Sequence, residues 1–181
     1  AKPETVRGPS SRITPPASKA IVRLKTIVAT ACLLLIAVPA TATPQRVVSM
    51  NVCTDQLAML IAGDGQLHSV SYLAGDPGSS VLADSAKDFA VNHGLAEEVF
   101  LMQPDLVIAG TYSTRATVAL LRRLGIRVEE FEPENDLDGI RANIARMGKI
   151  LGREQRAGEL IAELDRGIAD LAKTRPESVS V

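Results

Sequence analysis

The sequence contains no tryptophan, and aromatic residues make up only 3% of its 181 residues. Its two tyrosines, Tyr72 and Tyr112, therefore stand out as candidates for function. It also lacks an excess of positive charge: the formal net charge is −1, which argues against nucleic-acid binding, because such proteins concentrate Lys and Arg on one face. No GxGxxG or GxxxxGK[ST] motif is present, so a nucleotide site has no support. Hydrophobic residues at 46% and charged residues at 23% are typical of a soluble globular protein.

No apolar run is long enough to cross a membrane. The run TIVATACLLLIAV at 26–38 has about 13 residues, too few for a hydrocarbon core of about 30 Å. Positive charges precede it, and the small residues ATA at 40–42 follow it. This order predicts a secretory signal peptide at 21–42, cleaved after Ala42, behind a disordered leader at 1–20. We therefore expect the mature protein in the periplasm.

Cysteine is almost absent from the mature chain. Cys32 lies inside the apolar run, outside any lipoprotein context, and leaves with the signal peptide. Cys53 remains, and a single cysteine cannot form an internal disulfide. Cys53 follows a predicted strand at the start of a predicted helix, where a thiolate is stabilised. A secreted α/β thiol enzyme or hydrolase using Cys53 is therefore the alternative function.

A catalytic or metal site would need partners that the sequence does not offer. Only His68 and His93 could act as the base for Cys53, and no Cys/His/Asp signature is visible. A bare metal ion on Cys53 and His93 would have two ligands and no third. We expect no catalytic residues, no metal site and no cofactor.

Strands alternate with helices over 44–135. Strands are predicted at 46–50, 67–72, 105–110 and 127–132, and helices at 54–63, 96–102 and 114–125, with a short helical piece around 79–87. Alternation with short connections indicates βαβ units around a parallel sheet. The expected fold class is therefore an α/β lobe with a parallel sheet.

The pattern changes after Pro133. Apolar residues at helical spacing predict a helix over 136–152, with Asp136 as its N-cap and Gly152 at its end, and a long helix over 153–173. We expect 136–175 to be a helical linker that ends in a long connecting helix. Residues 176–181 look like the first residues of another strand, the start of a truncated second lobe.

Polar and aromatic residues follow the predicted strands. Ligands of open parallel sheets bind beyond the carboxyl ends of the strands. Arg115 begins a helix, where a cation gains nothing from the helix dipole, so it pairs with an acid such as Asp76 or faces an anionic group of a ligand. The ligand-binding residues that we expect are Asn51, Cys53, Thr54, Tyr72, Tyr112 and Arg115.

Several segments carry a family resemblance. RVVSMNVCTDQLAMLIAG, HGLAEEVFLMQPDLVIAG, LLRRLGIRVEEFEP and the long helix after 136 together resemble the periplasmic substrate-binding proteins of iron-siderophore, haem and cobalamin ABC importers. The most specific element is an acid seven residues before a Pro-Asp-Leu-Val strand start, here Glu97 before Pro104. Family members have two α/β lobes joined by one rigid helix, with the ligand between the lobes. The resemblance covers about 46–175 and implies an N-terminal lobe plus connecting helix, with the second lobe missing.

The resemblance also implies a function. The protein would capture a chelated metal complex, such as a ferric siderophore, haem or cobalamin, and deliver it to the membrane subunit of an ABC importer. The local sequence predicts that Val99, Phe100 and Met102 of the helix at 96–102 face inward, and that Glu97 and Glu98 in its first turn point to solvent. The resemblance implies that Glu97 docks on that subunit. The protein would be a monomer and not an enzyme, with no nucleic-acid partner. A third possible function, besides the binding protein and the thiol enzyme, is that of a module that only binds other macromolecules. Such a module would bind no small molecule.

Overall fold

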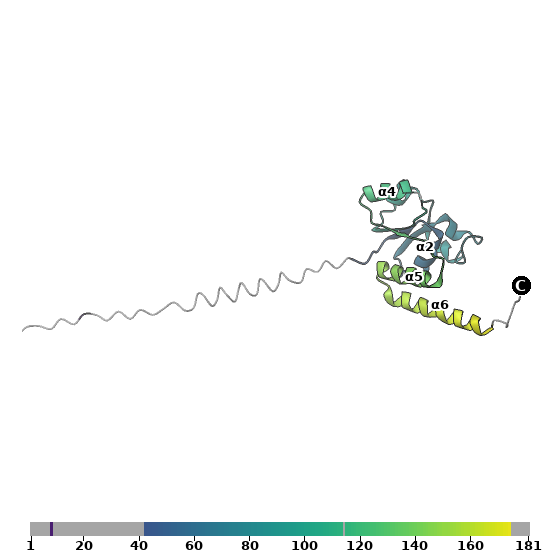
Figure 1. Cartoon of the computed structure of the whole chain (residues 1–181). Coiled ribbons are helices and arrows are strands. Elements are labelled where there is room, and N and C mark those ends of the chain that lie inside the picture. Colours follow the sequence, from purple (N-terminus) through teal and green to yellow (C-terminus); the bar gives the residue numbers. More distant parts are fainter. Residues whose placement is uncertain (1–7, 9–41, 114, 175–181) are drawn as a thin grey trace, which may run out of the picture. The chain divides into compact units, whose positions relative to one another are not determined.

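The computed structural model describes residues 8, 42–113 and 115–174, and those from Ala42 onward belong to one compact unit. The predicted leader at 1–20, the signal peptide at 21–42 and the strand start at 176–181 lie outside the described residues, apart from Gly8 and Ala42. Figure 1 shows the described part as a sheet flanked by helices.

A parallel sheet of five strands forms the centre of this unit. The strands are β1 (Val47–Ser49), β2 (Leu67–Ser71), β3 (Ala90–Asn92), β4 (Leu106–Gly110) and β5 (Val128–Phe131), in the order β3-β2-β1-β4-β5. The chain moves outward from β1 to β3 and then crosses to β4 on the other side of β1. The order therefore reverses between β1 and β4, and ligands of open α/β sheets bind at such a switch point.

The predicted fold class is confirmed, and one strand was missed. β3 has only three residues and lies at the edge of the sheet, where Ala90 and Val91 are exposed. It therefore lacks the apolar run or alternation that marks a strand in sequence. The helical piece expected around 79–87 is confirmed only at its end, where η3 (Ser85–Asp88) is a 3₁₀ helix, because turns occupy 81–84. A second 3₁₀ helix, η2 (Tyr72–Gly75), follows β2.

Helices cover both faces of the sheet. They are α2 (Val52–Ile61), α3 (Ala96–Leu101), α4 (Arg115–Arg123), α5 (Leu137–Leu151) and α6 (Glu154–Thr174). Successive strand residues point to opposite faces: Val47 and Ile108 pack with α2 and α5, whereas Val48 and Val107 pack with α3 and α4. The sheet thus lies between two helical layers, with α4 opposite α2 and α5 (Figure 1).

Local sequence rules explain both ends of α5 and its close contact with α6. The Asp136 carboxylate accepts the Gly139 N–H at 2.7 Å, as expected of an N-cap. Gly152 ends α5 with a φ of 65°, a left-handed conformation that favours glycine. Gly148 lets α6 approach α5 closely, because a Cβ at this position would collide with the Ala157 side chain.

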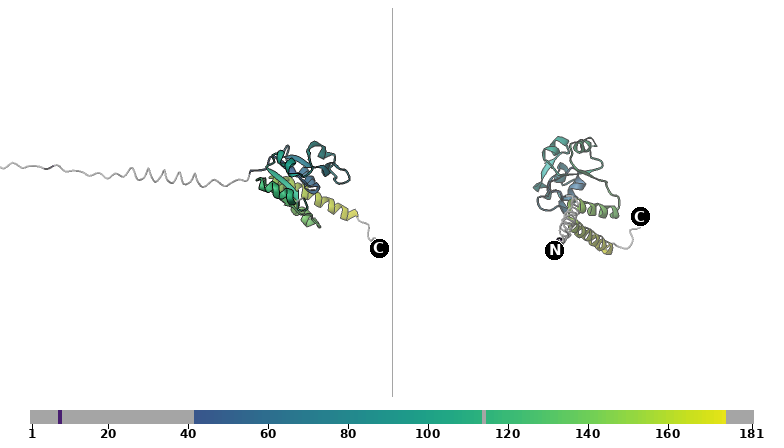
Figure 2. Two further views of the ribbon diagram at one scale, coloured as in Figure 1. Left: turned by 90° about the horizontal axis from the view of Figure 1, so that it is seen from above. Right: turned by 90° about the vertical axis from the view of Figure 1, so that its left-hand side faces the viewer.

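The first part of the long helix α6 packs against the core of this unit. Leu160, Ile161 and Leu164 pack against the core, whereas Leu171 is 71% exposed. Figure 2 shows the end of α6 extending away from the sheet. None of the helices in the described part combines the length and apolarity that a membrane span needs.

Candidate functional site

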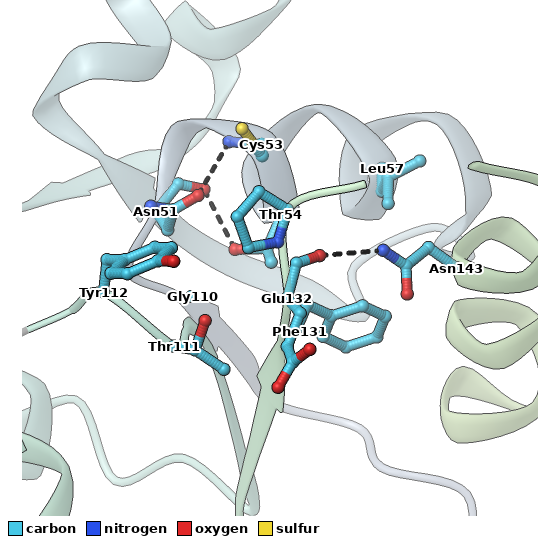
Figure 3. Close-up of a pocket in the computed structure, with 11 residues that line it drawn as sticks. Asn51, Cys53, Thr54, Leu57, Gly110, Thr111, Tyr112, Phe131, Glu132 and Asn143 are labelled. Atoms are coloured by element: carbon cyan, nitrogen blue, oxygen red, sulfur yellow. Dashed lines mark hydrogen bonds between the residues drawn. The ribbon is translucent and has the colours of Figure 1, made fainter. Parts of the chain in front are cut away.

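A pocket opens at the switch point, where the carboxyl ends of β1, β4 and β5 meet the start of α2 (Figure 3). Its lining residues are Asn51, Cys53, Thr54, Leu57, Gly110, Thr111, Tyr112, Phe131, Glu132, Pro133 and Asn143. The cavity volume is about 180 Å³, below the roughly 300–1,000 Å³ of pockets that enclose a drug-sized molecule. The pocket is therefore too small to enclose a drug-sized molecule.

Asn51 organises the central part of the pocket. It caps α2, with its Oδ1 accepting the Cys53 N–H at 3.0 Å. The Thr54 hydroxyl donates to the Asn51 carbonyl at 2.9 Å and lies 2.8 Å from the Ser49 hydroxyl. At Gly110 a Cβ would lie 3.0 Å from the Asn51 Nδ2, so a larger residue would push the tip of β4 away from Asn51.

A tight turn after β4 presents Tyr112. The Ser113 hydroxyl accepts the Gly110 N–H at 3.1 Å, and the Ser113 N–H donates to the Gly110 carbonyl at 2.8 Å. The turn leaves Tyr112 87% exposed at the rim of the pocket. An aromatic side chain held in this way is available to contact a ligand face.

The opposite wall comes from β5 and α5, and it was missed in the sequence. The Asn143 amide donates to the Glu132 carbonyl at 3.0 Å (Figure 3). The Arg146 guanidinium lies 4.3 Å from the centre of the Phe131 ring, a cation–π contact. The rule that points to strand tips, applied to the predicted strand at 127–132, could have found Phe131 and Glu132.

Four of the six expected ligand residues line the pocket: Asn51, Cys53, Thr54 and Tyr112. Arg115 lies in an adjoining groove that shares Thr111 and Glu132 with the pocket. Tyr72 lies at the tip of β2, 54% exposed, and stacks on His93.

Asp76, the acid that the sequence offered as a partner for Arg115, forms hydrogen bonds with other residues. Asp76 accepts hydrogen bonds from the Ser79 hydroxyl at 2.6 Å and from the Gly78 N–H at 3.1 Å, and these bonds lower its pKa. Among the described residues Arg115 forms no ion pair, so its charge is available at the edge of the groove.

Cys53 is exposed and has neither histidine beside it as a hydrogen-bond partner in the described part. His68 Nε2 lies 2.8 Å from the Arg46 guanidinium, and burial together with the Arg46 charge lowers the pKa of His68. His93 bonds to Glu98. The geometry therefore gives the Cys53 thiol no general base among the histidines. Within the described ranges no three His, Cys, Asp or Glu side chains gather as metal ligands.

Buried polar groups tie the strand tips together beneath this surface. Asp55 Oδ2 accepts the Ser71 hydroxyl at 2.5 Å and the Ser71 N–H at 3.2 Å, which joins α2 to β2. The Asn92 amide donates to the Ser49 carbonyl at 2.8 Å and to the Ser69 hydroxyl at 2.9 Å. Burial raises the pKa of Asp55, against the effect of its hydrogen bonds.

The structure corrects the expectation for α3. Glu97 is exposed, as expected, but Glu98 is half-buried, with its carboxylate accepting the His93 N–H at 2.7 Å. Val99 is buried, whereas Phe100 is 46% exposed. Ala96 and Val99 form the side of this short helix that packs in the core beside α4, and Phe100 lies outside that side.

Comparison with known proteins places the chain. The sequence pattern described as "Periplasmic binding protein" matches residues 54–178. A cobalamin-binding protein of Halobacterium salinarum is 27% identical over 142 residues, which are 76% of this chain and 37% of the relative.

Solved structures share the fold. A periplasmic heme binding protein from Pseudomonas aeruginosa has a TM-score of 0.61 at 23% identity, over 72% of this chain and 46% of that one. A periplasmic vitamin B12 binding protein of Vibrio cholerae has a TM-score of 0.58 at 21% identity, over 71% of this chain and 50% of that one. The chain thus spans about two fifths of the curated relative and about half of these structures.

Proposed function

The chain belongs to the periplasmic binding protein family, and we propose that it captures a chelated metal complex for an ABC importer. In this proposal the described unit is the N-terminal lobe, 44–135, of a two-lobed receptor, and 136–175 is the linker with the connecting helix. The ligand is a ferric siderophore, haem or cobalamin, the classes that the resemblance implies. The relatives named above bind cobalamin, heme and vitamin B12 according to their descriptions.

The observation that carries this proposal is the pocket at the switch point of the sheet. It is open and shallow, and it is lined by groups that suit contact with a large preformed complex: an exposed tyrosine, amide and hydroxyl groups and Phe131. A complex that brings its own chelator needs no cluster of metal ligands from the protein. The small volume supports a role as one wall, with a second lobe closing the other side.

Arg115 and Tyr72 extend the proposed contact surface on either side of the pocket. Arg115 would face an anionic group of the ligand, such as a carboxylate, phosphate or propionate, because no acid among the described residues neutralises it. Tyr72 lies one strand beyond β1 on the other side. Neighbouring strands are about 4.8 Å apart, so Tyr72 and Tyr112 can contact one bulky ligand together.

The site residues are tested by substitution in the full-length protein. Tyr72→Ala and Tyr112→Ala should each weaken binding of the complex by about 10-fold, because each removes aromatic contact area worth roughly 1–2 kcal/mol. Affinity is measured by titration with haemin, cyanocobalamin and ferrichrome. Unchanged affinity in both variants would remove this site assignment.

A binding role, rather than catalysis, is supported by the surroundings of Cys53, where neither histidine is in place as a base. Alkylation of Cys53 distinguishes the two functions. A binding protein should keep its affinity or lose part of it, whereas a thiol enzyme would lose a hydrolytic activity.

We further propose that Glu97 docks the lobe on the membrane subunit of the importer, and that the protein reaches the periplasm through the signal peptide at 21–42. Glu97 is exposed in the first turn of α3, and no described residue pairs with it. Its carboxylate is therefore free to meet a positively charged partner.

A further inference from the structure

β5 lies at one edge of the sheet, so one side of its backbone has no strand beside it in the described part of the chain. The carbonyls of Arg127 and Phe131 accept N–H groups from β4 and from the residue that follows it, at 2.9 and 3.0 Å. Backbone groups of successive strand residues alternate between the two sides of the strand. The carbonyls of Val128, Glu130 and Glu132 therefore point away from the sheet.

Side chains from the two flanking helices bond to all three of these outward carbonyls. Arg122 of α4 donates from Nη2 to the Val128 carbonyl at 3.1 Å. Arg146 of α5 donates from Nη1 to the Glu130 carbonyl at 2.7 Å. Asn143, also on α5, bonds to the last of the three carbonyls (Figure 3). The outward acceptors of this edge are thus occupied from both faces of the sheet.

The two glutamates of β5 hold the arginines in these positions. Successive side chains of a strand point to opposite faces, so Glu130 faces α4 and Glu129 faces α5. Glu130 Oε2 lies 2.7 Å from Arg122 Nη2, and Glu129 Oε2 lies 3.1 Å from Arg146 Nη2. Each guanidinium therefore bonds to a carboxylate and to a carbonyl of the same strand, which fixes its planar group across the edge.

An exposed edge strand is a template for pairing with another chain, and proteins block such edges with charged side chains or with very short strands. We propose that Arg122 and Arg146 prevent β5 from pairing edge to edge with β5 of a second copy of this protein. Such pairing needs the Val128 and Glu130 carbonyls as acceptors, and the guanidinium groups occupy them. At the other edge of the sheet, β3 has only three residues, a length that itself limits pairing. This inference is independent of the proposed function.

The test replaces both arginines in the full-length protein, as Arg122→Leu combined with Arg146→Leu, which frees both carbonyls. The matched control combines Arg123→Leu with Arg127→Leu, which removes the same charge and adds the same apolar groups near the edge. Arg123 is exposed, and Arg127 pairs with Glu129 at 3.0 Å but bonds to no outward carbonyl in the described part. Light scattering over a range of protein concentrations measures the mass in solution, and circular dichroism checks the fold.

The wild type and the control should remain monomeric, whereas the Arg122→Leu/Arg146→Leu variant should form a dimer whose fraction grows with concentration. Hydrogen exchange of the outward Val128 and Glu130 amides should be slower in this dimer than in the monomer. Adding Glu130→Pro should restore the monomer, because proline removes an outward N–H that edge pairing needs and is tolerated on edge strands.

A folded double variant that stays monomeric at every concentration would overturn the inference. A dimer that the control forms equally, or that Glu130→Pro leaves intact, would also overturn it, since the contact then lies outside β5. If the double variant does not fold, Arg122→Leu and Arg146→Leu are measured singly, because each frees one carbonyl; association by neither rejects the proposed role. A wild type that already dimerises with slow exchange at Val128 rejects it as well.

Discussion

At the scale of single residues, the buried carboxyl of Asp55 lies in an environment that disfavours its ionised form. Its Oδ2 is satisfied by Ser71, but its Oδ1 has no hydrogen-bond partner in the described part of the chain. Burial raises its pKa above the ordinary 3.8. The ionised form therefore costs the folded protein free energy at neutral pH, and this cost disappears as the pH falls through the folded pKa toward 3.8.

We expect Asp55→Asn to remove this contribution. As the pH falls from 7 toward 4, the unfolding free energy of the wild type should rise relative to that of the variant, by on the order of 1 kcal/mol. Urea unfolding of both proteins at a series of pH values measures the difference. If the unfolding free energy of the wild type minus that of the variant stays constant or decreases as the pH is lowered, the pKa of Asp55 is not raised in the folded protein.

The effect of His68 on the pH dependence of stability is opposite to that of Asp55 and needs its own control. Its pKa is lowered by burial and by Arg46, so stability from this group is complete above 6.5 and is lost as the pH falls through the folded pKa. Repeating the comparison in a His68→Gln background isolates the contribution of Asp55.

The positions of residues at strand ends could be predicted where the strand itself was recognised in the sequence. Tyr72 and Tyr112 were placed at strand tips because predicted strands precede them, and the structure confirms their positions. The surroundings of His93 were not predictable, since they depend on β3, whose exposed residues carry no sequence signal. The bond between Asp55 and Ser71 joins residues 16 apart in the chain, and local patterns do not reveal such pairs.

At the scale of secondary structure, the junction of α3 and β4 contains a strained residue. Gln103 has a φ of 51°, the only positive value among the described residues other than glycine. It directly follows Met102, the C-cap of α3, a position where glycine is favoured because a Cβ is costly in the left-handed region.

We predict that Gln103→Gly raises the free energy of unfolding by up to about 1 kcal/mol, because glycine adopts this conformation without strain. Gln103→Ala is the matched control, since it shortens the side chain and keeps the strain. Thermal unfolding compares the two. If alanine stabilises as much as glycine, the backbone conformation is not the cause.

Helices and strands with clear periodicity were predicted closely, including the N-cap Asp136 and the end of α5 at Gly152. The direction of side chains on α3 was not. Six residues are too few for a periodic pattern, and their burial depends on which neighbours the fold supplies. Phe100 is exposed for this reason.

At the scale of the whole molecule, the docking proposal depends on the charge of Glu97. Glu98 is not a neutral comparison, because it holds His93. Asp64 is a better one: it is exposed, and it lies in the turn before β2 at the opposite edge of the sheet.

We expect Glu97→Gln in the full-length protein to leave folding and ligand affinity unchanged, and to slow association with the membrane subunit. Exposed charge pairs act mainly on the association rate and its salt dependence. Transport into proteoliposomes and surface binding at several salt concentrations measure the effect, with Asp64→Asn as the control. Equal effects of the two substitutions, or loss of ligand affinity from Glu97→Gln, would contradict a docking role.

The central claim is that the full-length protein captures a chelated metal complex at the carboxyl edge of this sheet. Isothermal titration with haemin, cyanocobalamin, aquacobalamin and ferrichrome tests it most directly, with Tyr112→Ala measured beside the wild type. We predict saturable binding of at least one of these complexes at a single site, weakened about 10-fold by Tyr112→Ala. Failure to bind any of them, or binding that Tyr112→Ala and Tyr72→Ala both leave unchanged, would contradict the claim.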